Sequence, residues 1–417
     1  MRVGFVIGGI PSLGHSGSTL ASWAIVEALL EAGHEVTAVL CPADYLLDET
    51  VPDRLSALEQ LGADVRVVGV PPPPEPGSRW SARARFARSL VSPSDADLLP
   101  AVRATEGVRA ALGDVDVGMA FGIEAIAATA YLDAAPFLAV LSHPPGVSRR
   151  VRLRYDPPQR ALVARASERS FLAHADRRTA KLLRRFASVG VFSGDHAVWA
   201  RRHGVHAWYA HYPMPDLAGP DWRERRAAAQ AGAERPRILM IGHLRGIGTI
   251  SGLHLFVPGI LPRLTEELGE DGFEVHVVGG QDPPAAFVEG LRHPAVRLRG
   301  QISSAEEEFF AAHVLLAPNP TTTGASARIL SGLTFGSCIV AHTDSVVGIP
   351  ELEHGANSLL AADASGLARE TLTALRDPAL RERLGDEARR LYESAFSPPV
   401  AAGRIVAELE RLGATRV

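Results

Sequence analysis

The sequence has few of the features that mark metal sites, disulfide frameworks or membrane spans. Its two cysteines, Cys41 and Cys338, lie far apart, and their spacing suggests neither a metal site nor a disulfide. No apolar run approaches the length needed to cross a bilayer, and the opening MRVGFVIGG does not read as a signal peptide. The net charge of -4 gives no general reason to expect nucleic-acid binding. We therefore expect a cytoplasmic protein.

The composition is that of a well-packed globular protein, with 46% hydrophobic and 22% charged residues. A chain of 417 residues is long for one domain, so two domains of ordinary size are expected.

The first half opens with an apolar run, residues 3–7, that is typical of a buried parallel strand. Gly8 and Gly9 end this strand, a helical pattern follows over 16–30, and residues 36–40 are the next strand. This is a βαβ unit, but it lacks the G-x-G-x-x-G fingerprint, and its second strand ends on Cys41 instead of a ribose-binding acid. The pattern argues against a nicotinamide or flavin site.

The second half repeats the first in kind, because residue 237 begins another series of strand, glycine turn and helix. Residues 216–236 are polar and alanine-rich, which predicts a linker. We predict an α/β protein with two Rossmann-like domains, 1–215 and 237–394, facing across a cleft. A helix within 395–417 is expected to cross back to the first domain.

A candidate anion site lies where the strand 314–317 leads through a polar run into a helix that begins near Gly324, Ala325 and Ser326. The first N–H groups of such a helix lack partners, and the helix dipole favours negative charge there, so a phosphate or diphosphate is suited to this turn. Arg328 could add positive charge. An ordinary βα turn without a ligand explains the same residues.

His143 follows the strand 137–141, at the end of the sheet where open α/β folds bind ligands. It could hydrogen-bond a substrate hydroxyl or act in acid–base chemistry, and it could equally be a structural turn residue.

Residues 149–185 hold twelve Arg or Lys against three Asp or Glu. This stretch could contact an anionic membrane surface or a phosphorylated acceptor, or it could be the solvated face of a surface helix.

The order of these features resembles that of GT-B glycosyltransferases, and the C-terminal half is similar to family 4 of the retaining enzymes. The resemblance covers nearly the whole chain and is densest over 237–367. The segments that carry it in the C-terminal half are 238–242, 275–279, 296–300, 317–318, 324–330, 336–341 and 348–360. In the N-terminal half they are the Gly8-Gly9 turn with its helix, residues 32–36, and residues 137–143.

The resemblance implies retaining transfer of a sugar from a nucleotide diphosphate to a hydroxyl, with no cofactor and no metal. By position, His143 would contact the transferred sugar, and Gly8 and Gly9 would approach the donor phosphates. The backbone at Gly300, Gln301 and Ile302 would pair with the base. Gly324, Ala325 and Ser326 would lie under the distal phosphate, where the anion argument also places one.

The chain departs from the family pattern at four charged positions. Thr323 and Ser331 stand where the family has two glutamates, which contact the sugar and the ribose. His243 and Thr249 stand where the family has an Arg and a Lys that clamp the diphosphate after the turn at Gly242. Arg245 and Arg328 are nearby and could supply the missing charge.

We expect His143, Arg245 and Arg328 to take part in catalysis. The expected donor-binding residues are Gly8, Gly9, Gly242, His243, Gly300, Gln301, Ile302, Thr323, Gly324, Ala325, Ser326 and Ser331.

The leading interpretation is a glycosyltransferase acting on a natural-product or saccharide acceptor. The alternative is a catalytically diverged GT-B protein that binds a sugar nucleotide or uses an unusual activated-sugar donor. A third interpretation is a GT-B enzyme of another class, an epimerase or a phosphorylase-like protein. A phosphorylase of this fold would need a lysine for pyridoxal phosphate, and the only lysine is Lys181, in the basic stretch of the first half.

Overall fold

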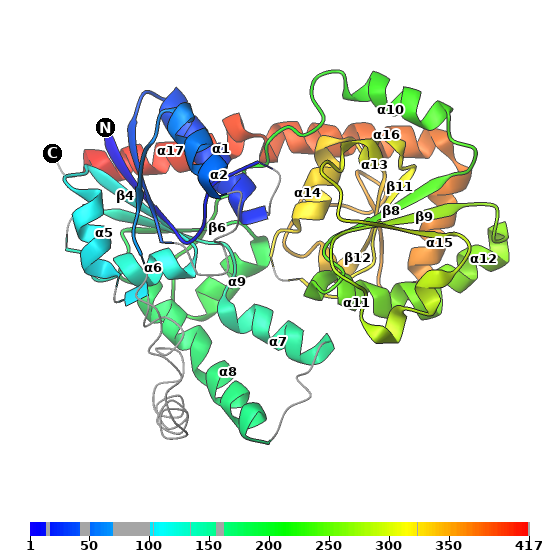
Figure 1. Cartoon of the computed structure of the whole chain (residues 1–417), viewed down its shortest axis with the longest axis horizontal. Coiled ribbons are helices and arrows are strands. Elements are labelled where there is room, and N and C mark those ends of the chain that lie inside the picture. Colours follow the sequence, from blue (N-terminus) through cyan, green and yellow to red (C-terminus); the bar gives the residue numbers. More distant parts are fainter. Residues whose placement is uncertain are drawn as a thin grey trace. The chain divides into compact units, whose positions relative to one another are not determined.

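The computed structural model describes residues 1–13, 17–41, 51–69, 101–102, 104–133, 135–155, 162–322 and 324–415. The chain divides into two compact units. The first unit comprises Met1–Arg150, Pro158–Pro213 and Pro398–Val417, and the second comprises Val151–Pro157 and Met214–Ser397. Each unit is built on its own parallel sheet with helices on both faces (Figure 1). These two parallel sheets with helices on both faces confirm the predicted fold class, two Rossmann-like α/β domains.

The sheet of the first unit has seven strands in the order β3-β2-β1-β4-β5-β6-β7, and every pairing between neighbours is parallel. The central strands are buried on both faces, which is why they appear in the sequence as continuous apolar runs. The strands are β1 Arg2–Ile7, β2 Glu35–Leu40, β3 Asp64–Val67, β4 Val117–Phe121, β5 Phe137–Leu141, β6 Ser188–Val191 and β7 Trp208–Tyr209.

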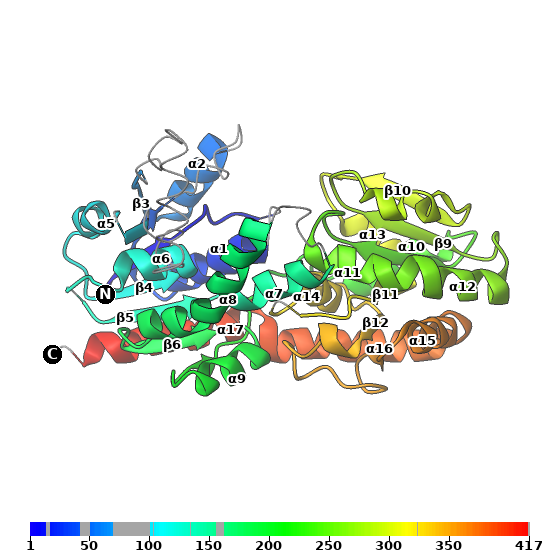
Figure 2. The same cartoon turned by 90° about the horizontal axis from the view of Figure 1, so that it is seen from below.

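Helices α1 and α17 cover one face of this sheet, and α5, α6 and α8 cover the other (Figure 1). The second view shows α17 running along β4 and β5 (Figure 2). The helices of the first unit are α1 Gly17–Glu31, α2 Val51–Leu61, α5 Thr105–Leu112, α6 Ile123–Thr129, α8 Leu162–Leu183, α9 Gly194–Arg202 and α17 Pro398–Ala414. Helix α7, Pro145–Tyr155, starts in the first unit and ends in the second.

The sheet of the second unit has six parallel strands in the order β10-β9-β8-β11-β12-β13. Helices α11, α12 and α15 lie on one face, and α10, α13, α14 and α16 lie on the other (Figure 1). The strands are β8 Arg237–Ile241, β9 Glu274–Val278, β10 Val296–Gly300, β11 Val314–Ala317, β12 Ile339–His342 and β13 Leu359–Ala361. The helices are α10 Trp222–Ala231, α11 Ile247–Leu255, α12 Leu261–Leu268, α13 Glu306–Ala311, α14 Ala327–Thr334, α15 Ala364–Arg376 and α16 Pro378–Leu391.

Residues 216–236, which we expected to be a linker, form part of the second unit and contain α10. Trp222 at the start of this helix is buried, and the guanidinium groups of Arg226 and Arg389 lie over its ring. Helix α10 packs on α13. The buried side chain of Trp222 and the arginines over its ring hold this alanine-rich helix in place. Because one buried apolar side chain is enough here, the sequence shows no helical periodicity of apolar residues.

The continuous helical segment Ile247–Leu268 is long and apolar enough to cross a membrane, by length and composition alone. This finding corrects the expectation that no run in the chain approaches that length. The segment joins α11 and α12 through a π-helical turn, Phe256–Ile260. Its apolar residues, among them Leu253, Phe256 and Leu264, belong to the hydrophobic core of the second unit. The segment therefore has the environment of a core helix.

Candidate functional site

The carboxyl ends of β8, β9 and β10 meet at one edge of the second sheet. The N–H of Gly242 donates to the carbonyl of Val278 at 2.9 Å, and the N–H of Gly279 donates to the carbonyl of Gly300 at 2.9 Å. Gly242 has a φ of 142°, and a Cβ atom built on it would lie 2.7 Å from Thr249 Oγ1. The turn after β8 therefore requires glycine, both for its backbone conformation and for the close approach of its neighbours.

Arg328 points from the first turn of α14 onto this glycine turn. Its Nη2 donates a hydrogen bond to Thr249 Oγ1 at 3.3 Å. Cβ atoms built on Gly242 and Gly248 would lie 2.8 and 3.1 Å from the same nitrogen. The residues around β8 and α11 therefore leave a space that the guanidinium group fills.

The guanidinium of Arg328 forms no ion pair with any carboxylate among the residues that the structure describes. Burial lowers the pKa of Arg328 to about 10, so the group still carries its positive charge at neutral pH. An enclosed cation without a counter-ion is costly, and it attracts an anionic ligand. The electrostatics of this edge therefore suit a phosphate group.

The loop after β11 leads to the amino end of α14. Asn319 is buried, its Nδ2 donates to the carbonyl of Thr321 at 3.0 Å, and its Oδ1 has no partner in the described part of the chain. The N–H of Gly324 donates to the hydroxyl of Thr322 at 3.0 Å. The hydroxyl of Tyr155 on α7 donates to the carbonyl of Pro320 at 3.3 Å and fixes the loop from the side. Thr323 lies outside the described residues.

Ser326 is the N-cap residue of α14, and its side chain makes no capping hydrogen bond. The N–H groups of Ala327 and Arg328 follow in the first turn, where a helix supplies no acceptor of its own. Ala325 and Ser326 are partly exposed, and Ser331 lies in the next turn of the same helix. The N–H groups of Ala327 and Arg328 and the guanidinium group of Arg328 thus all belong to the first turn of α14.

The other residues predicted for the site in the second unit follow strands that end at this edge, and they differ in their exposure and in the residues they contact. His243 and Arg245 are both exposed in the turn after β8, and the carbonyl of His243 accepts a hydrogen bond from Gly246. A Cβ atom built on Gly280 would lie 2.9 Å from Gln301 Oε1, so the Gln301 side chain lies against the end of β9. Ile302 follows Gln301 and is partly exposed. Of the two predicted arginines, Arg328 contacts Gly242 from α14, and Arg245 lies exposed in the turn itself.

The corresponding edge of the first unit holds His143, Gly8 and Gly9. Strand β1 lies beside β4, and β4 lies beside β5, so the residues after these strands come to one edge of the sheet. His143 Nδ1 lies 3.2 Å from Ser142 Oγ. The His143 side chain reaches the surface, yet the protein packed around it lowers its pKa through burial.

Two residues at this edge were missed by the sequence reasoning. His196, in the first turn of α9 after β6, is fully buried, and its Nε2 lies 3.9 Å from Asp195 Oδ2. Burial lowers the pKa of His196 to about 4, with His143 close enough to contribute. Glu124 lies in the first turn of α6 after β4. The available signal was their position, because Glu124 follows the apolar strand β4 by a few residues and His196 follows β6 in the same way.

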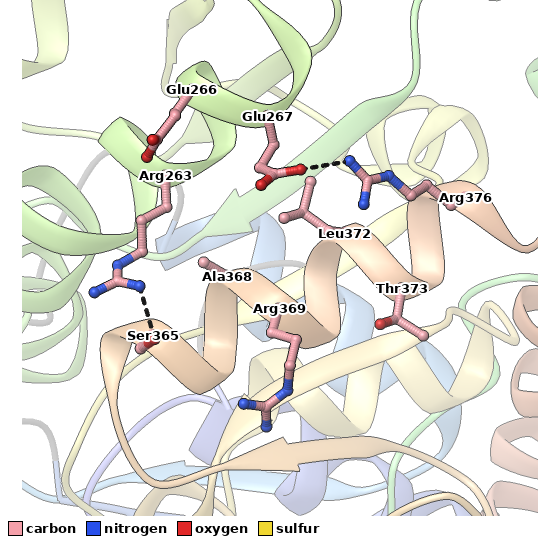
Figure 3. A pocket seen from close by; sticks show the side chains of 9 residues that line it. All are labelled: Arg263, Glu266, Glu267, Ser365, Ala368, Arg369, Leu372, Thr373 and Arg376. Atoms are coloured by element: carbon pink, nitrogen blue, oxygen red, sulfur yellow. Dashed lines mark hydrogen bonds and ion pairs between the residues drawn. The ribbon is translucent and has the colours of Figure 1, made fainter.

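A hollow of about 340 Å³ lies in the second unit between α12 and α15 (Figure 3). Arg263 donates to Ser365 at 2.7 Å, and Arg376 donates to Glu267 at 2.7 Å. Ala368 and Leu372 form its apolar floor between these pairs (Figure 3). Because Arg376 already pairs with Glu267, and because the hollow contains no predicted site residue, we do not assign a ligand to it.

Residues 235–377 match a protein-family model described as glycosyl transferases group 1. The match spans most of the second unit, including the β8 turn and α14. The sequence matches none of the curated proteins with which it was compared.

Three solved structures share the fold over nearly their whole length. Sucrose-phosphate synthase from Thermosynechococcus elongatus is 16% identical with a TM-score of 0.71, and the match covers 99% of each chain. Anabaena HepE in complex with UDP-glucose is 13% identical with a TM-score of 0.66, covering 99% of this chain and 100% of HepE. A mutant of S. aureus TarM in complex with fondaparinux, alpha-GlcNAc-glycerol and UDP is 9% identical with a TM-score of 0.67. The match covers 99% of this chain and 100% of TarM.

At these identities the structures establish the fold, which is that of GT-B glycosyltransferases. Residues 235–377 of the second unit match the group 1 model, and the fold and this match together indicate a glycosyltransferase.

Proposed function

We propose that this chain transfers a sugar from a nucleotide-diphosphate donor to a hydroxyl group of a natural-product or saccharide acceptor, with retention of configuration. The group 1 family match supports the reaction class. The HepE structures with UDP and with UDP-glucose support a nucleotide-sugar as the donor.

The observation that carries the proposal is the guanidinium of Arg328 beside the amino end of α14, which contacts Thr249 and has no carboxylate partner among the described residues. The leaving nucleoside diphosphate gains negative charge as the bond to the sugar breaks. A preorganised cation and aligned N–H groups stabilise that charge most effectively where water is excluded. Arg328 and the first turn of α14 provide both, so in this proposal the reaction needs no metal.

The remaining predicted residues take proposed roles around this centre. The amides of Ala325 and Ser326, joined by that of Gly324 if it gives up its bond to Thr322, would hold the distal phosphate, and the backbone of Gly300, Gln301 and Ile302 would hold the base. His143 would be the residue of the first unit that contacts the transferred sugar. These assignments follow the family resemblance, and the placement of each residue at the carboxyl edge of its own sheet supports them.

The proposal is tested by binding of UDP, GDP, ADP, TDP and CDP, measured by thermal shift and calorimetry on the full chain. A nucleotide at a hundred times its dissociation constant should stabilise the protein by about 2.7 kcal/mol. Arg328→Gln should weaken the best ligand at least tenfold, because a charge-assisted contact contributes about 1.5–3 kcal/mol.

Arg292→Gln is the matched control, since Arg292 is an exposed arginine of the same unit whose partner is Glu289. It should bind nucleotides like the unmodified chain. A flat response of the unmodified chain to every nucleotide would count against the proposed donor.

A further inference from the structure

A second hollow, of about 250 Å³, lies at the amino edge of the second sheet. Its floor is made by residues that come directly before two strands: His313 before β11, and Ser337 and Cys338 before β12. Helix α10 contributes Arg226 to its wall, and α16, on the same face of the sheet, contributes Arg381 (Figure 1). The hollow thus belongs entirely to the second unit.

This hollow is separate from the candidate donor site. All strands of a parallel sheet begin at one edge and end at the other, and the four residues of β11 span about 13 Å. The hollow lies where β11 and β12 begin, whereas the turn at Gly242 follows the end of β8 and Arg328 begins α14. A ligand in the hollow therefore does not compete for the guanidinium group of Arg328.

Arg381 offers two adjacent hydrogen-bond donors at this hollow. Its Nη1 donates to the carbonyls of Ala374 and Leu375 at the end of α15, at 2.7 and 2.9 Å, and these bonds hold the guanidinium group in place. Its Nε and Nη2 bond to no described residue, and it forms no ion pair with a described carboxylate. Nε and Nη2 share one edge of the planar group, and such an edge binds two oxygens of one anion.

Two uncharged side chains add further donors. The Nδ1 of His313 accepts from the N–H of Arg237 at 3.0 Å. Burial, together with the charges of Arg381 and Arg237, lowers the pKa of His313 to about 4, so at neutral pH its one ring proton lies on Nε2. Ser337 is 5% exposed, and its hydroxyl group has no partner among the described residues. A buried hydroxyl without a partner is unfavourable, so a hydrogen-bonding ligand would stabilise it.

Positive charge exceeds negative charge around the hollow. Arg223, Arg226 and Arg381 line it. Asp386 lies 2.9 Å from Arg223 and 3.9 Å from Arg226, so one carboxylate serves two arginines. Glu382 is exposed and forms no ion pair among the described residues. Three guanidinium groups against two carboxylates leave one positive charge, which favours an anionic ligand.

The number of donors decides which anion fits. A phosphate group has at least three acceptor oxygens, so it can accept from both donors of Arg381 and also from His313 and Ser337. The two oxygens of a carboxylate are already used by Arg381. The volume of about 250 Å³ far exceeds the roughly 10–15 Å³ that one water requires, so a small group attached to the phosphate also fits.

We infer that this hollow binds a phosphate group, either as free phosphate or on a small phosphorylated molecule. Arg381 binds two of its oxygens, His313 and Ser337 donate to the others, and Arg226 adds positive charge. The inference assigns a binding site and no reaction. It does not depend on the proposed function, because none of these residues belongs to the proposed donor site.

The test titrates inorganic phosphate and ribose 5-phosphate into the full chain, with ribose as the uncharged probe, by calorimetry and phosphorus NMR. Arg381→Gln should weaken phosphate binding at least tenfold, and Arg381→Lys, which keeps the charge and loses the paired donors, should weaken it several-fold. Arg383→Gln is the matched control. Arg383 is an exposed arginine of the same helix that donates to the carbonyl of Gly355 at 3.1 Å, so binding should stay unchanged.

Glu382→Gln gives a variant with the opposite expected effect. Removing this negative charge should tighten phosphate binding by about twofold or more at low ionic strength. Because Glu382 is exposed and forms no ion pair, its replacement keeps the fold intact, and damage to the fold would not tighten binding. Glu382→Gln therefore tests the inference even where Arg381→Gln lowers stability through its bonds to α15.

The probes distinguish the two sources of the phosphate. Tighter binding of ribose 5-phosphate identifies a phosphorylated molecule as the ligand, and equal binding of the two anions identifies free phosphate. Ribose should not bind. Equal phosphate binding by Arg381→Gln and the unmodified chain would overturn the inference, as would a chain that binds neither anion or a Glu382→Gln variant that binds them no more tightly.

Arg328→Gln separates this inference from the proposed donor site. It should change phosphate binding at the hollow by less than twofold, because Arg328 lies at the opposite edge of the sheet. Phosphate binding that is lost in Arg328→Gln and kept in Arg381→Gln would place the anion at the donor site and would overturn the inference. A chain that binds no nucleotide contradicts only the proposed donor.

Discussion

Thr249 in α11 accepts a hydrogen bond from Arg328 in α14 at 3.3 Å, across 79 residues of sequence. The same nitrogen of Arg328 lies 3.1 Å from the position where a Cβ atom of Gly248 would be. The first turns of two helices that follow neighbouring strands thus hold one cation between them. The guanidinium group of Arg328 fits at this position because Gly248, in the first turn of α11, has no side chain.

Gly248→Ala tests this dependence without adding backbone strain. The new methyl group would require Arg328 to move by a few tenths of an ångström. We expect nucleotide binding to weaken about three- to tenfold, since charge-assisted bonds depend strongly on geometry, while alanine in a helix keeps the fold stable. Calorimetry and thermal melting measure the two effects. Gly232→Ala, whose Cβ position has no neighbour within 4 Å, is the control, and equal affinities in all three proteins would contradict the prediction.

Arg389 and Asp216 form a bidentate ion pair that fixes the start of the second unit. Arg389 Nη1 and Nη2 donate to the two carboxylate oxygens of Asp216 at 2.8 and 2.7 Å, and Nη1 also donates to the carbonyl of Thr334 at 2.5 Å. The arginine side chain is 8% exposed and that of Asp216 is 35% exposed. Arg389→Met should lower the free energy of unfolding by about 2–3 kcal/mol, since a partly exposed pair contributes less than a fully buried one.

Urea denaturation measures this loss. Arg390→Met is the matched control, because Arg390 is the next residue and its pair with Glu387 is exposed. The control should change stability by less than about 0.5 kcal/mol. A similar loss in both variants would show that the Asp216 pair is not the cause.

Glu308 should make the second unit sensitive to acid. Its Oε2 lies 2.6 Å from His276 Nδ1, and its Oε1 accepts from Arg299 Nε at 2.8 Å. Burial opposes ionisation, but the bonds to His276 and Arg299 outweigh it, and the pKa of Glu308 is lowered. A lowered folded-state pKa contributes stability above the ordinary value of about 4.5, and this stability is lost as the pH falls through the folded pKa.

Thermal melting between pH 7 and pH 3 measures this contribution. Glu308→Gln should melt at a lower temperature than the unmodified chain at pH 7, and the gap should narrow as the pH falls. Glu307→Gln, at the neighbouring position of α13, should follow the unmodified chain throughout. A gap that is constant with pH would show that packing, and not charge, explains the effect.

Much of the fold was predictable because parallel strands buried on both faces leave continuous apolar runs. Strand β5 was predicted at the bounds that the structure shows, and β8 begins at residue 237, where a strand was predicted. Contacts between elements leave no such run in the sequence. Gly252 in α11, for example, lets the loop after β11 approach, since its Cβ position lies 3.2 Å from Pro318 Cγ.

The candidate site was predictable only where it is local in sequence. The turn into α14 contains its own small residues and Arg328, so the anion argument could be made from one stretch. The hydrogen bond between Arg328 and Thr249 depends on β8 and β11 being neighbours in the sheet. The contact between Glu124 and Gly8 depends in the same way on β1 and β4. Crossover connections set these orders, and the periodicity of a single chain does not encode them.

Gly336 ends α14 where Trp222 packs, and its replacement separates two physical effects. Its φ is 58°, and a Cβ atom built on it would lie 2.3 Å from Trp222 Cζ3. Gly355 has a similar φ of 77°, but its Cβ position has no neighbour within 4 Å. Gly355→Ala should therefore cost only the left-handed backbone strain, about 1–2 kcal/mol.

Gly336→Ala should cost that strain and, in addition, the displacement of a buried indole ring, for a total of about 3 kcal/mol or more. Urea denaturation compares the two variants, and the fluorescence of the indole in each folded state reports whether Trp222 has moved. Equal losses in the two variants would mean that Trp222 yields without cost. In that case α10 would not be anchored by Trp222, and the packing of residues 216–236 on the second unit would have to depend on the polar contacts of Arg226 and Gln230.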